Sequence, residues 1–199
     1  ITQCMRNLPF ETLLLATYAL DDPTDRDRNI DYFNAVLDGD FLPKSPEELF
    51  QAGEYNKVPV LFGCNKDEGL FISYQAILDP SLYQEWRDNW DHYGPLLLQG
   101  IQRDEVTHVD IDRADKILQF YLNNTSGFNE AHLTNLTDMF SDSYFWYGQY
   151  AMSEYFIRDN IPSFQYLLTF KGQYSYLDMF GIDSSDYGVC HVDELFYLW

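Results

Sequence analysis

Two short apolar runs, far apart in the chain, are each followed by a titratable side chain. Residues 58–62 (VPVLF) precede Glu68, and residues 164–170 (FQYLLTF) precede a glycine-containing loop that leads to His191. Short, nearly continuous apolar runs are typical of strands buried on both faces of a parallel sheet. Open α/β sheets place their chemistry at the carboxyl ends of such strands. The two runs therefore predict an α/β fold with a carboxylate and a histidine at one edge of a sheet.

The carboxylate precedes the histidine along the chain, as in the Ser–Glu–His triad of an α/β-hydrolase sheet. In such a triad the histidine takes the proton of the serine hydroxyl, and the carboxylate holds the other ring nitrogen. Spacing alone leaves open whether Asp67 or Glu68 is the acid. The 199 residues contain no Gly-x-Ser-x-Gly motif, so we expect the nucleophile to lie upstream of Ile1.

The charge balance argues against several classes of partner. The chain has 32 acidic and 12 basic residues and a formal net charge of −20. Nucleic-acid binding needs clustered basic residues, and so does docking on anionic membranes. No run reaches the roughly 20 apolar residues that span a bilayer. The 18% aromatic content suits a thick core and an apolar substrate cleft.

Hydrophobic periodicity and capping signals predict the remaining elements. Ser45, Pro46 and Glu48 form a capping box that predicts a short helix ending at Gly53. We expect further helices over residues 1–20, 80–91, 112–122 and 130–158, the last broken near 141–143, and a helix starting at Leu195. With no linker or repeat in the sequence, residues 1–199 read as one incomplete domain.

The cysteines and histidines do not form a metal-binding pattern. Cys4, Cys64 and Cys190 lack CxxC spacing, and the three other histidines lack i, i+4 spacing. We therefore expect no metal and no organic cofactor.

Glycosylation sequons favour a secreted or luminal protein. Asn123 and Asn124 begin two overlapping sequons, and Asn135 begins a third. Asn135 falls in a predicted helix, where access is poorer.

The segments around the two titratable residues resemble the type-B carboxylesterase and cholinesterase family, in its invertebrate esterase branch. Residues 58–69 (VPVLFGCNKDEG) are similar to that family's strand and acid loop, and residues 188–195 (GVCHVDEL) to the segment that bears its histidine. The resemblance runs in order over the whole chain. It implies an α/β-hydrolase fold that extends beyond both ends of this sequence.

The resemblance also implies roles for single residues. Glu68, the glutamate before the glycine, matches the triad acid, and His191 matches the catalytic histidine. Glu194 matches a carboxylate that lies next to the triad residues without belonging to the triad. Phe71 and Ile72 match positions that line the substrate pocket. Cys4 resembles the second cysteine of a small disulfide loop whose partner would lie before Ile1.

The sequence thus predicts a serine carboxylic ester hydrolase that acts on a small-molecule ester, with these 199 residues inactive by themselves. The alternative is a non-catalytic adhesion or receptor protein on the same fold. Retention of both Glu68 and His191 favours the enzyme, since adhesion needs neither. The sequence does not indicate the oligomeric state or the particular ester.

Overall fold

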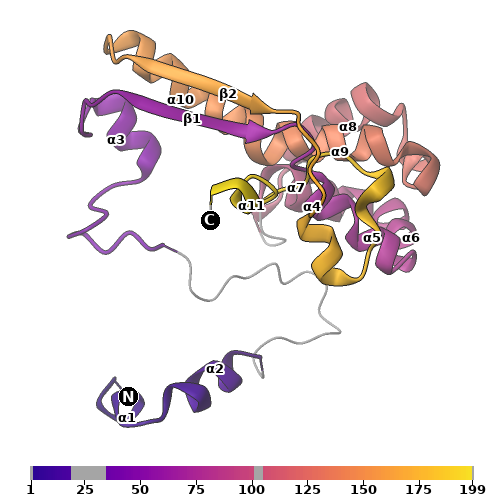
Figure 1. Cartoon of the computed structure of the whole chain (residues 1–199), viewed down its shortest axis with the longest axis horizontal. Coiled ribbons are helices and arrows are strands. Elements are labelled where there is room, and N and C mark those ends of the chain that lie inside the picture. Colours follow the sequence, from indigo (N-terminus) through magenta and orange to yellow (C-terminus); the bar gives the residue numbers. More distant parts are fainter. Residues whose placement is uncertain (1, 19–34, 101–104, 199) are drawn as a thin grey trace. The chain divides into compact units, whose positions relative to one another are not determined.

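In the computed structural model, which describes residues 2–18, 35–100 and 105–198, the two predicted strands lie side by side in one parallel sheet (Figure 1). Strand β1 (Val60–Asn65) pairs with β2 (Ser163–Leu168) in a register that places Val60 opposite Ser163 and Asn65 opposite Leu168. Both carboxyl ends therefore meet at one edge. The expected α/β class is confirmed, although β1 begins two residues later than the apolar run and continues to Asn65.

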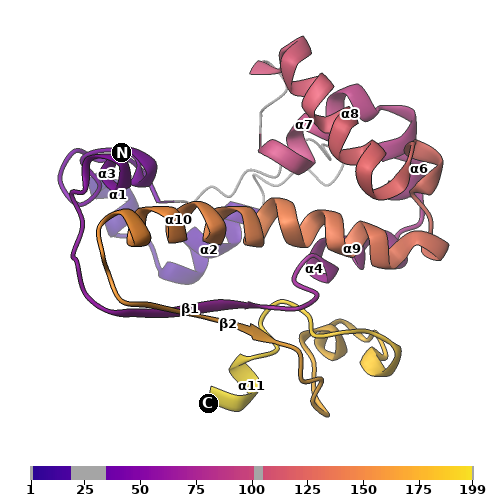
Figure 2. The same cartoon turned by 90° about the horizontal axis from the view of Figure 1, so that it is seen from above.

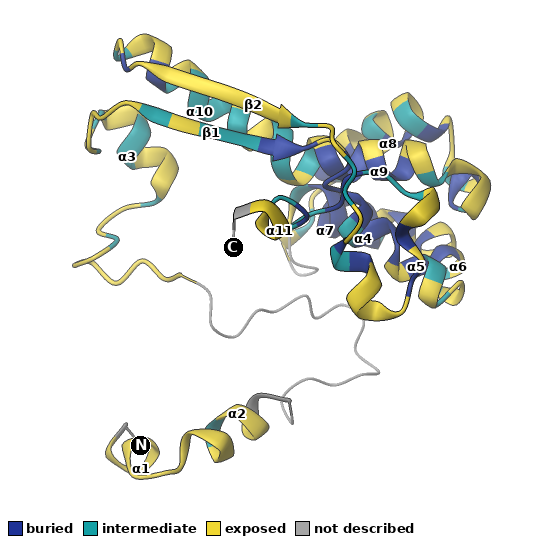
Figure 3. Cartoon of the chain, viewed as in Figure 1, coloured by how far each residue is buried: buried dark blue, intermediate teal, exposed yellow. Residues whose placement is uncertain are grey.

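Helix α10 (Tyr147–Arg158) runs along the sheet and covers one of its faces (Figure 2). The ring of Phe156 packs against Phe62 of β1, with ring centroids 5.7 Å apart. The side-chain amide of Gln149 donates to the carbonyl oxygen of Gly63 at 2.7 Å. Since side chains alternate across a strand, Leu61 and Phe164 point to the opposite face, where they are 72% and 63% exposed. Most of β2 is exposed (Figure 3).

Helix α3 (Pro46–Ala52) forms where the capping box predicted it, and it packs on the end of α10. The Phe50 ring lies against the Tyr155 and Phe156 rings. The Arg158 guanidinium donates to the carbonyl oxygens of Phe50 and Gln51. Unpaired carbonyls at the end of α3 are thus satisfied by a cation.

The helices that follow β1 and precede α10 in the sequence supply most of the hydrophobic core. These elements are α4 (Leu70–Ser73), α5 (Gln75–Leu78), α6 (Ser81–Asp88), α7 (Trp90–Gln99), α8 (His108–Leu122), η2 (Thr125–Gly127), η3 (Glu130–His132) and α9 (Leu133–Ser141). Trp86, Trp90, Phe128 and Phe140 are buried in this core, with edge-on and tilted rings. Among the described residues, no helix has the length and apolar character needed to cross a membrane.

The break predicted near residues 141–143 is a π-helix, η4 (Asp142–Trp146), which joins α9 directly to α10. The helical path therefore continues with one wider turn. Single π-turns inside α-helices occur frequently at functional sites. Here the wider turn carries Phe145, whose ring faces the site described below.

The chain forms two units, residues Ile1–Pro46 and Glu47–Trp199. In the first, the predicted helix over 1–20 is split into α1 (Thr2–Arg6) and α2 (Phe10–Tyr18). Pro9 accounts for the split, because it lacks the amide that a continuous helix would need and its carbonyl instead starts α2. The expectation of one domain over 1–199 stays a prediction.

After β2 the chain turns through η5 (Tyr176–Phe180), η6 (Ser184–Asp186) and α11 (Leu195–Leu198). This segment packs on α4 through a small core that contains Leu70, Tyr74, Leu177, Ile182 and Cys190. The packing brings residues 188–194 next to the turn that follows β1.

Candidate active site

The turn after β1, residues 66–69, is held by bonds to three other segments. Lys66 N donates to Leu168 O at the end of β2 (2.9 Å), and Gly69 N donates to the Ser141 hydroxyl of α9 (2.8 Å). Asp67 N donates to Val189 O at 3.0 Å. Gly69 has no room for a side chain, because a Cβ there would lie 2.3 Å from the carbonyl oxygen of Thr137. The position of Glu68 is therefore set by the surrounding structure.

Glu68 and His191 are in direct contact. Glu68 Oε2 lies 2.7 Å from His191 Nδ1, and Glu68 Oε1 accepts a 2.8 Å bond from the backbone amide of Asn65. Because an ionised carboxylate only accepts, Nδ1 must carry the proton in this contact. The neutral imidazole then keeps an unprotonated Nε2, which is the nitrogen that a general base uses.

The hydrogen bond and the charges around this pair stabilise the protonated form of His191. The Glu68 side chain is 7% exposed, whereas that of His191 is 37% exposed. The hydrogen bond from Glu68 raises the pKa of His191, and the negative charges of Glu68 and Glu194 act in the same direction. Burial lowers this pKa but does not outweigh them. The carboxylate thus stabilises the imidazolium that would form during proton transfer.

Asn65, the last residue of β1, connects the acid turn to Glu194. Its side-chain amide donates to Cys190 O at 2.8 Å and to Glu194 Oε2. Asn65 is only 1% exposed. Glu194 is thus linked to the Glu68–His191 pair through Asn65, and its role beside a triad stays a prediction.

Two phenylalanine rings flank His191. Phe71 of α4 lies with its ring centroid 5.4 Å from the imidazole, and Phe145 of η4 lies at 4.9 Å. Ile72, the other pocket residue suggested by the resemblance, is buried in the helical core with Trp86 and Phe140. Its role in a pocket stays a prediction.

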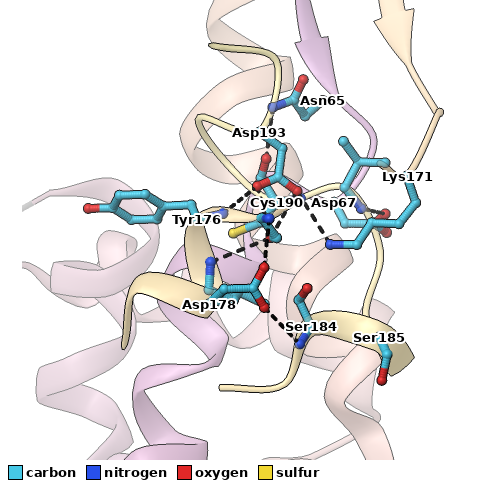
Figure 4. A network of polar contacts seen from close by, with 12 residues as sticks. Asn65, Asp67, Lys171, Tyr176, Asp178, Ser184, Ser185, Cys190 and Asp193 are labelled. Atoms are coloured by element: carbon cyan, nitrogen blue, oxygen red, sulfur yellow. Dashed lines mark hydrogen bonds and ion pairs between the residues drawn. The ribbon is translucent and has the colours of Figure 1, made fainter. Parts of the chain in front are cut away.

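A polar network lies behind the histidine turn (Figure 4). Asp193 accepts bonds from Tyr176 N at 2.7 Å, from Cys190 N at 2.9 Å and from the Ser175 hydroxyl. Lys171 Nζ lies 3.6 Å from Asp193 Oδ2. Asp178 accepts from Ser175 N and Ser184 N, and so braces the loop on its other side.

The other predicted positions are exposed in the described chain. Asn123 and Asn124 are exposed after α8, and Asn135 is exposed on α9. Cys4 is exposed and free in the described chain. No group of three or more His, Cys, Asp or Glu side chains that could hold a metal occurs in the described part.

Sequence reasoning did not predict the roles that four residues have in the site. Asn65 and Phe145 contact the pair or its neighbours, and Asp67 and Asp193 hold the two turns together. The sequence carried one signal, since Asp67 and Asp193 are acids inside short turns beside Glu68 and His191. Phe145 had none, because its orientation depends on the π-turn.

Comparison with known proteins found similarity to one family and to several of its members. The model of the carboxylesterase family matches residues 1–199. Juvenile hormone esterase of Tribolium castaneum is 28% identical over 169 residues, which cover 80% of this chain and 28% of that protein. Venom carboxylesterase-6 of Apis mellifera is 27% identical over 161 residues, 78% of this chain and 28% of that protein. Carboxylesterase 1F of Mus musculus is 37% identical over 73 residues, which cover 34% of this chain and 13% of that protein.

Proposed function

Because the chain belongs to the carboxylesterase family, we propose that the complete protein is a serine hydrolase of carboxylic esters in which His191 is the general base and Glu68 its acid partner. The observation that carries the proposal is the 2.7 Å contact between Glu68 Oε2 and His191 Nδ1. The chain spans 28% of the length of the Tribolium castaneum and Apis mellifera relatives. The nucleophilic serine and the oxyanion hole are therefore assigned to residues outside this sequence.

The reaction follows the triad scheme. The serine hydroxyl gives its proton to His191 Nε2 as its oxygen attacks the ester carbonyl. The imidazolium then protonates the departing alkoxide, which leaves an acyl-serine. Water, deprotonated by the same nitrogen, releases the carboxylic acid and regenerates the serine. Glu68 supports each step by holding the Nδ1 proton and by stabilising the imidazolium.

Phe71 and Phe145 support an ester with an apolar substituent. Their rings flank the imidazole, and aromatic rings give a substrate large apolar contact area at a fixed position. Short-chain aryl esters such as p-nitrophenyl acetate are therefore suitable first substrates.

The experiment is ester hydrolysis by the full-length protein, its Glu68→Gln and His191→Ala variants, and a His132→Ala control. His132 is exposed and its ring bonds to Asn129, away from the site. We expect kcat to fall by about 10⁴-fold in Glu68→Gln and by about 10⁶-fold in His191→Ala, and to stay unchanged in the control. Residues 1–199 alone should be inactive. Full activity in either triad variant would refute the assignment.

The alternative function is that of a non-catalytic adhesion or receptor protein on the same fold. The intact Glu68–His191 contact argues against it, because a surface that only binds has no need for a histidine held in one tautomer.

We further propose a secreted or luminal protein with a glycan at Asn123 or Asn124. Both side chains are exposed. In the third sequon Thr137 is 4% exposed, and its hydroxyl is bonded to Ser73. In the folded chain the threonine of the Asn135 sequon is therefore inaccessible to a glycosylating enzyme, although the asparagine is exposed.

A further inference from the structure

The residue after His191 has an unfavourable backbone conformation. Val192 has φ of 76°, in the left-handed region. The other two described residues with positive φ that are not glycine are Asn123 and Asn160. Asparagine adopts this region readily, whereas for a β-branched residue it is an outlier. Such strain persists where the surrounding structure holds it, and it gathers at functional sites.

The carboxylate of Asp193 holds this turn closed. Its Oδ2 accepts from Cys190 N at 2.9 Å, and Asp193 N donates to Cys190 O at 3.1 Å. These two bonds tie together the residues on either side of His191 and Val192. Asp193 is only 2% exposed, so water does not compete for its oxygens.

The same carboxylate joins the turn to the loop after β2. Its Oδ1 accepts from Tyr176 N at 2.7 Å, and the Ser175 hydroxyl donates at 2.9 Å. Lys171 Nζ is buried, makes no hydrogen bond and lies 3.6 Å from Asp193 Oδ2. The ammonium of Lys171 therefore faces the Asp193 carboxylate directly (Figure 4).

We propose that Asp193 is a positioning residue for His191: with Lys171 as its counter-ion, it holds Val192 in the left-handed conformation that keeps the imidazole on Glu68. The proposal rests on the proposed function, in which His191 is the general base. Asp193 does not touch the imidazole or the substrate. It acts through the backbone of residues 190–193.

An asparagine at this position could not do the same. The ionised carboxylate accepts from donors on both oxygens, Tyr176 N on Oδ1 and Cys190 N on Oδ2. An amide has one oxygen and an NH₂ group, so one of these donors would face another donor. It would also remove the carboxylate that lies 3.6 Å from Lys171 Nζ.

The first experiment compares full-length wild-type protein with Asp193→Asn and with Asp178→Asn. Asp178 is a matched control, because it also accepts two backbone amides of this loop but does not touch the histidine turn. We expect Asp193→Asn to lower kcat about 100-fold with little change in KM, as a shift of about 1 Å in a catalytic group does. Asp178→Asn should keep kcat within about threefold.

A rescue experiment distinguishes a positioning role of Asp193 from a general contribution to the stability of the fold. Glycine adopts positive φ without strain. In the double variant Val192→Gly/Asp193→Asn the turn can therefore keep its left-handed conformation without the Asp193 carboxylate. We expect it to regain about tenfold in kcat over Asp193→Asn. The proposal is overturned if Asp193→Asn keeps wild-type kcat, if Asp178→Asn loses as much, or if the double variant regains nothing. Should Asp193→Asn not fold, Lys171→Met/Asp193→Asn removes the unpaired cation and takes its place.

A histidine titration by NMR tests the proposal without any substrate. The titratable groups that face His191 are Glu68 of the acid turn and Glu194 of its own turn, while η4 and α4 present the rings of Phe145 and Phe71. Since Glu68 raises the pKa of His191, Asp193→Asn should lower it by releasing the imidazole. An unchanged His191 pKa in Asp193→Asn overturns the positioning role, whereas a lower one together with an inactive wild type would refute only the esterase assignment.

Discussion

Asp67 and Val189, 122 residues apart in the chain, are joined by two hydrogen bonds, one from Asp67 N to Val189 O at 3.0 Å and one from Val189 N to Asp67 Oδ2 at 2.9 Å. Glu68 follows the first residue directly, and His191 lies two positions after the second. The pair of bonds therefore brings Glu68 and His191 to the same place, as the proposed triad requires.

Asp67→Ala should misalign the triad without removing any member of it. It leaves the buried Val189 amide without its acceptor, which costs about 1–3 kcal/mol of stability. We expect kcat to fall by about 100-fold. Asp67→Asn, whose oxygen can still accept from Val189 N, should stay close to wild type. Urea unfolding and hydrolysis of p-nitrophenyl acetate measure both effects, and equal loss in the two variants would contradict this role.

The pH dependence of hydrolysis should follow His191. The general base must be neutral, so kcat/KM should fall as pH drops through the His191 pKa, which Glu68 raises. In Glu68→Gln the residual kcat/KM should fall only at a lower pH, because the carboxylate no longer stabilises the imidazolium. Profiles of kcat/KM against pH check this, and coincident limbs would contradict it.

The same shift has a consequence for stability. A raised pKa means that protonated His191 stabilises the fold below its unfolded value of about 6.5, and that this contribution is lost as pH rises through the folded value. The difference in unfolding free energy between wild type and His191→Gln should therefore shrink as pH rises from 6 towards 8. Urea unfolding at several pH values measures it.

Gly188 should not tolerate a side chain. A Cβ there would lie 1.9 Å from Asp67 Oδ2, the oxygen that binds Val189 N. We expect Gly188→Ala to destabilise by about 1–3 kcal/mol through overpacking. Gly148→Ala on helix α10 is the control, since nothing lies within 4 Å of its Cβ, and it should stabilise by about 0.5–1 kcal/mol. Similar unfolding midpoints for the two variants would rule out the close approach.

Thiol labelling should separate the three cysteines. Burial raises the pKa of Cys64 to about 11 and that of Cys190 to about 12, and only thiolates react readily. Both should resist iodoacetamide at pH 8 until the protein unfolds. Cys4 is exposed and should react after mild reduction. Labelling of Cys4 in the full-length protein before reduction would refute the expected disulfide.

Glycopeptide mass spectrometry of the protein secreted from insect cells tests the sequons. We expect occupancy at Asn123 or Asn124 and little at Asn135, whose amide donates to Tyr121 O and whose sequon threonine is buried. Asn123→Gln/Asn124→Gln should remove most of the enzymatically releasable glycan mass, whereas Asn135→Gln should leave it unchanged. Occupancy at Asn135 alone would contradict the accessibility argument.

The elements that sequence reasoning placed well are those set by local signals. Helix α3 starts at Pro46 as its capping box required, and β1 and β2 form on the two apolar runs. Helices α6 and α8 lie where periodicity placed them, although α8 begins at His108, four residues earlier than expected. Caps and apolar periodicity act over a few residues, so they can be seen in the chain itself.

Other features of the fold could not be predicted from local sequence signals. The sequence predicted a break in the long helix near residues 141–143, but that the helix continues there through a π-turn that brings Phe145 beside His191 depends on how both helices pack. Ile72 and Phe71 are neighbours in the sequence, yet Phe71 lies beside the imidazole while Ile72 faces the helical core. Which side of a four-residue helix meets the site is decided by tertiary packing.

The sequence by itself determined the two strands, the acid and histidine segments that follow them, and through them the family. The tertiary structure alone decided that Glu68 reaches His191, while Asp67, its neighbour, binds the backbone of Val189 instead. It also decided that Asp193 closes a strained turn around Val192. The physical reason is that strand formation and capping depend on nearby residues, whereas the partner of a buried carboxylate depends on which donors packing brings within about 3 Å.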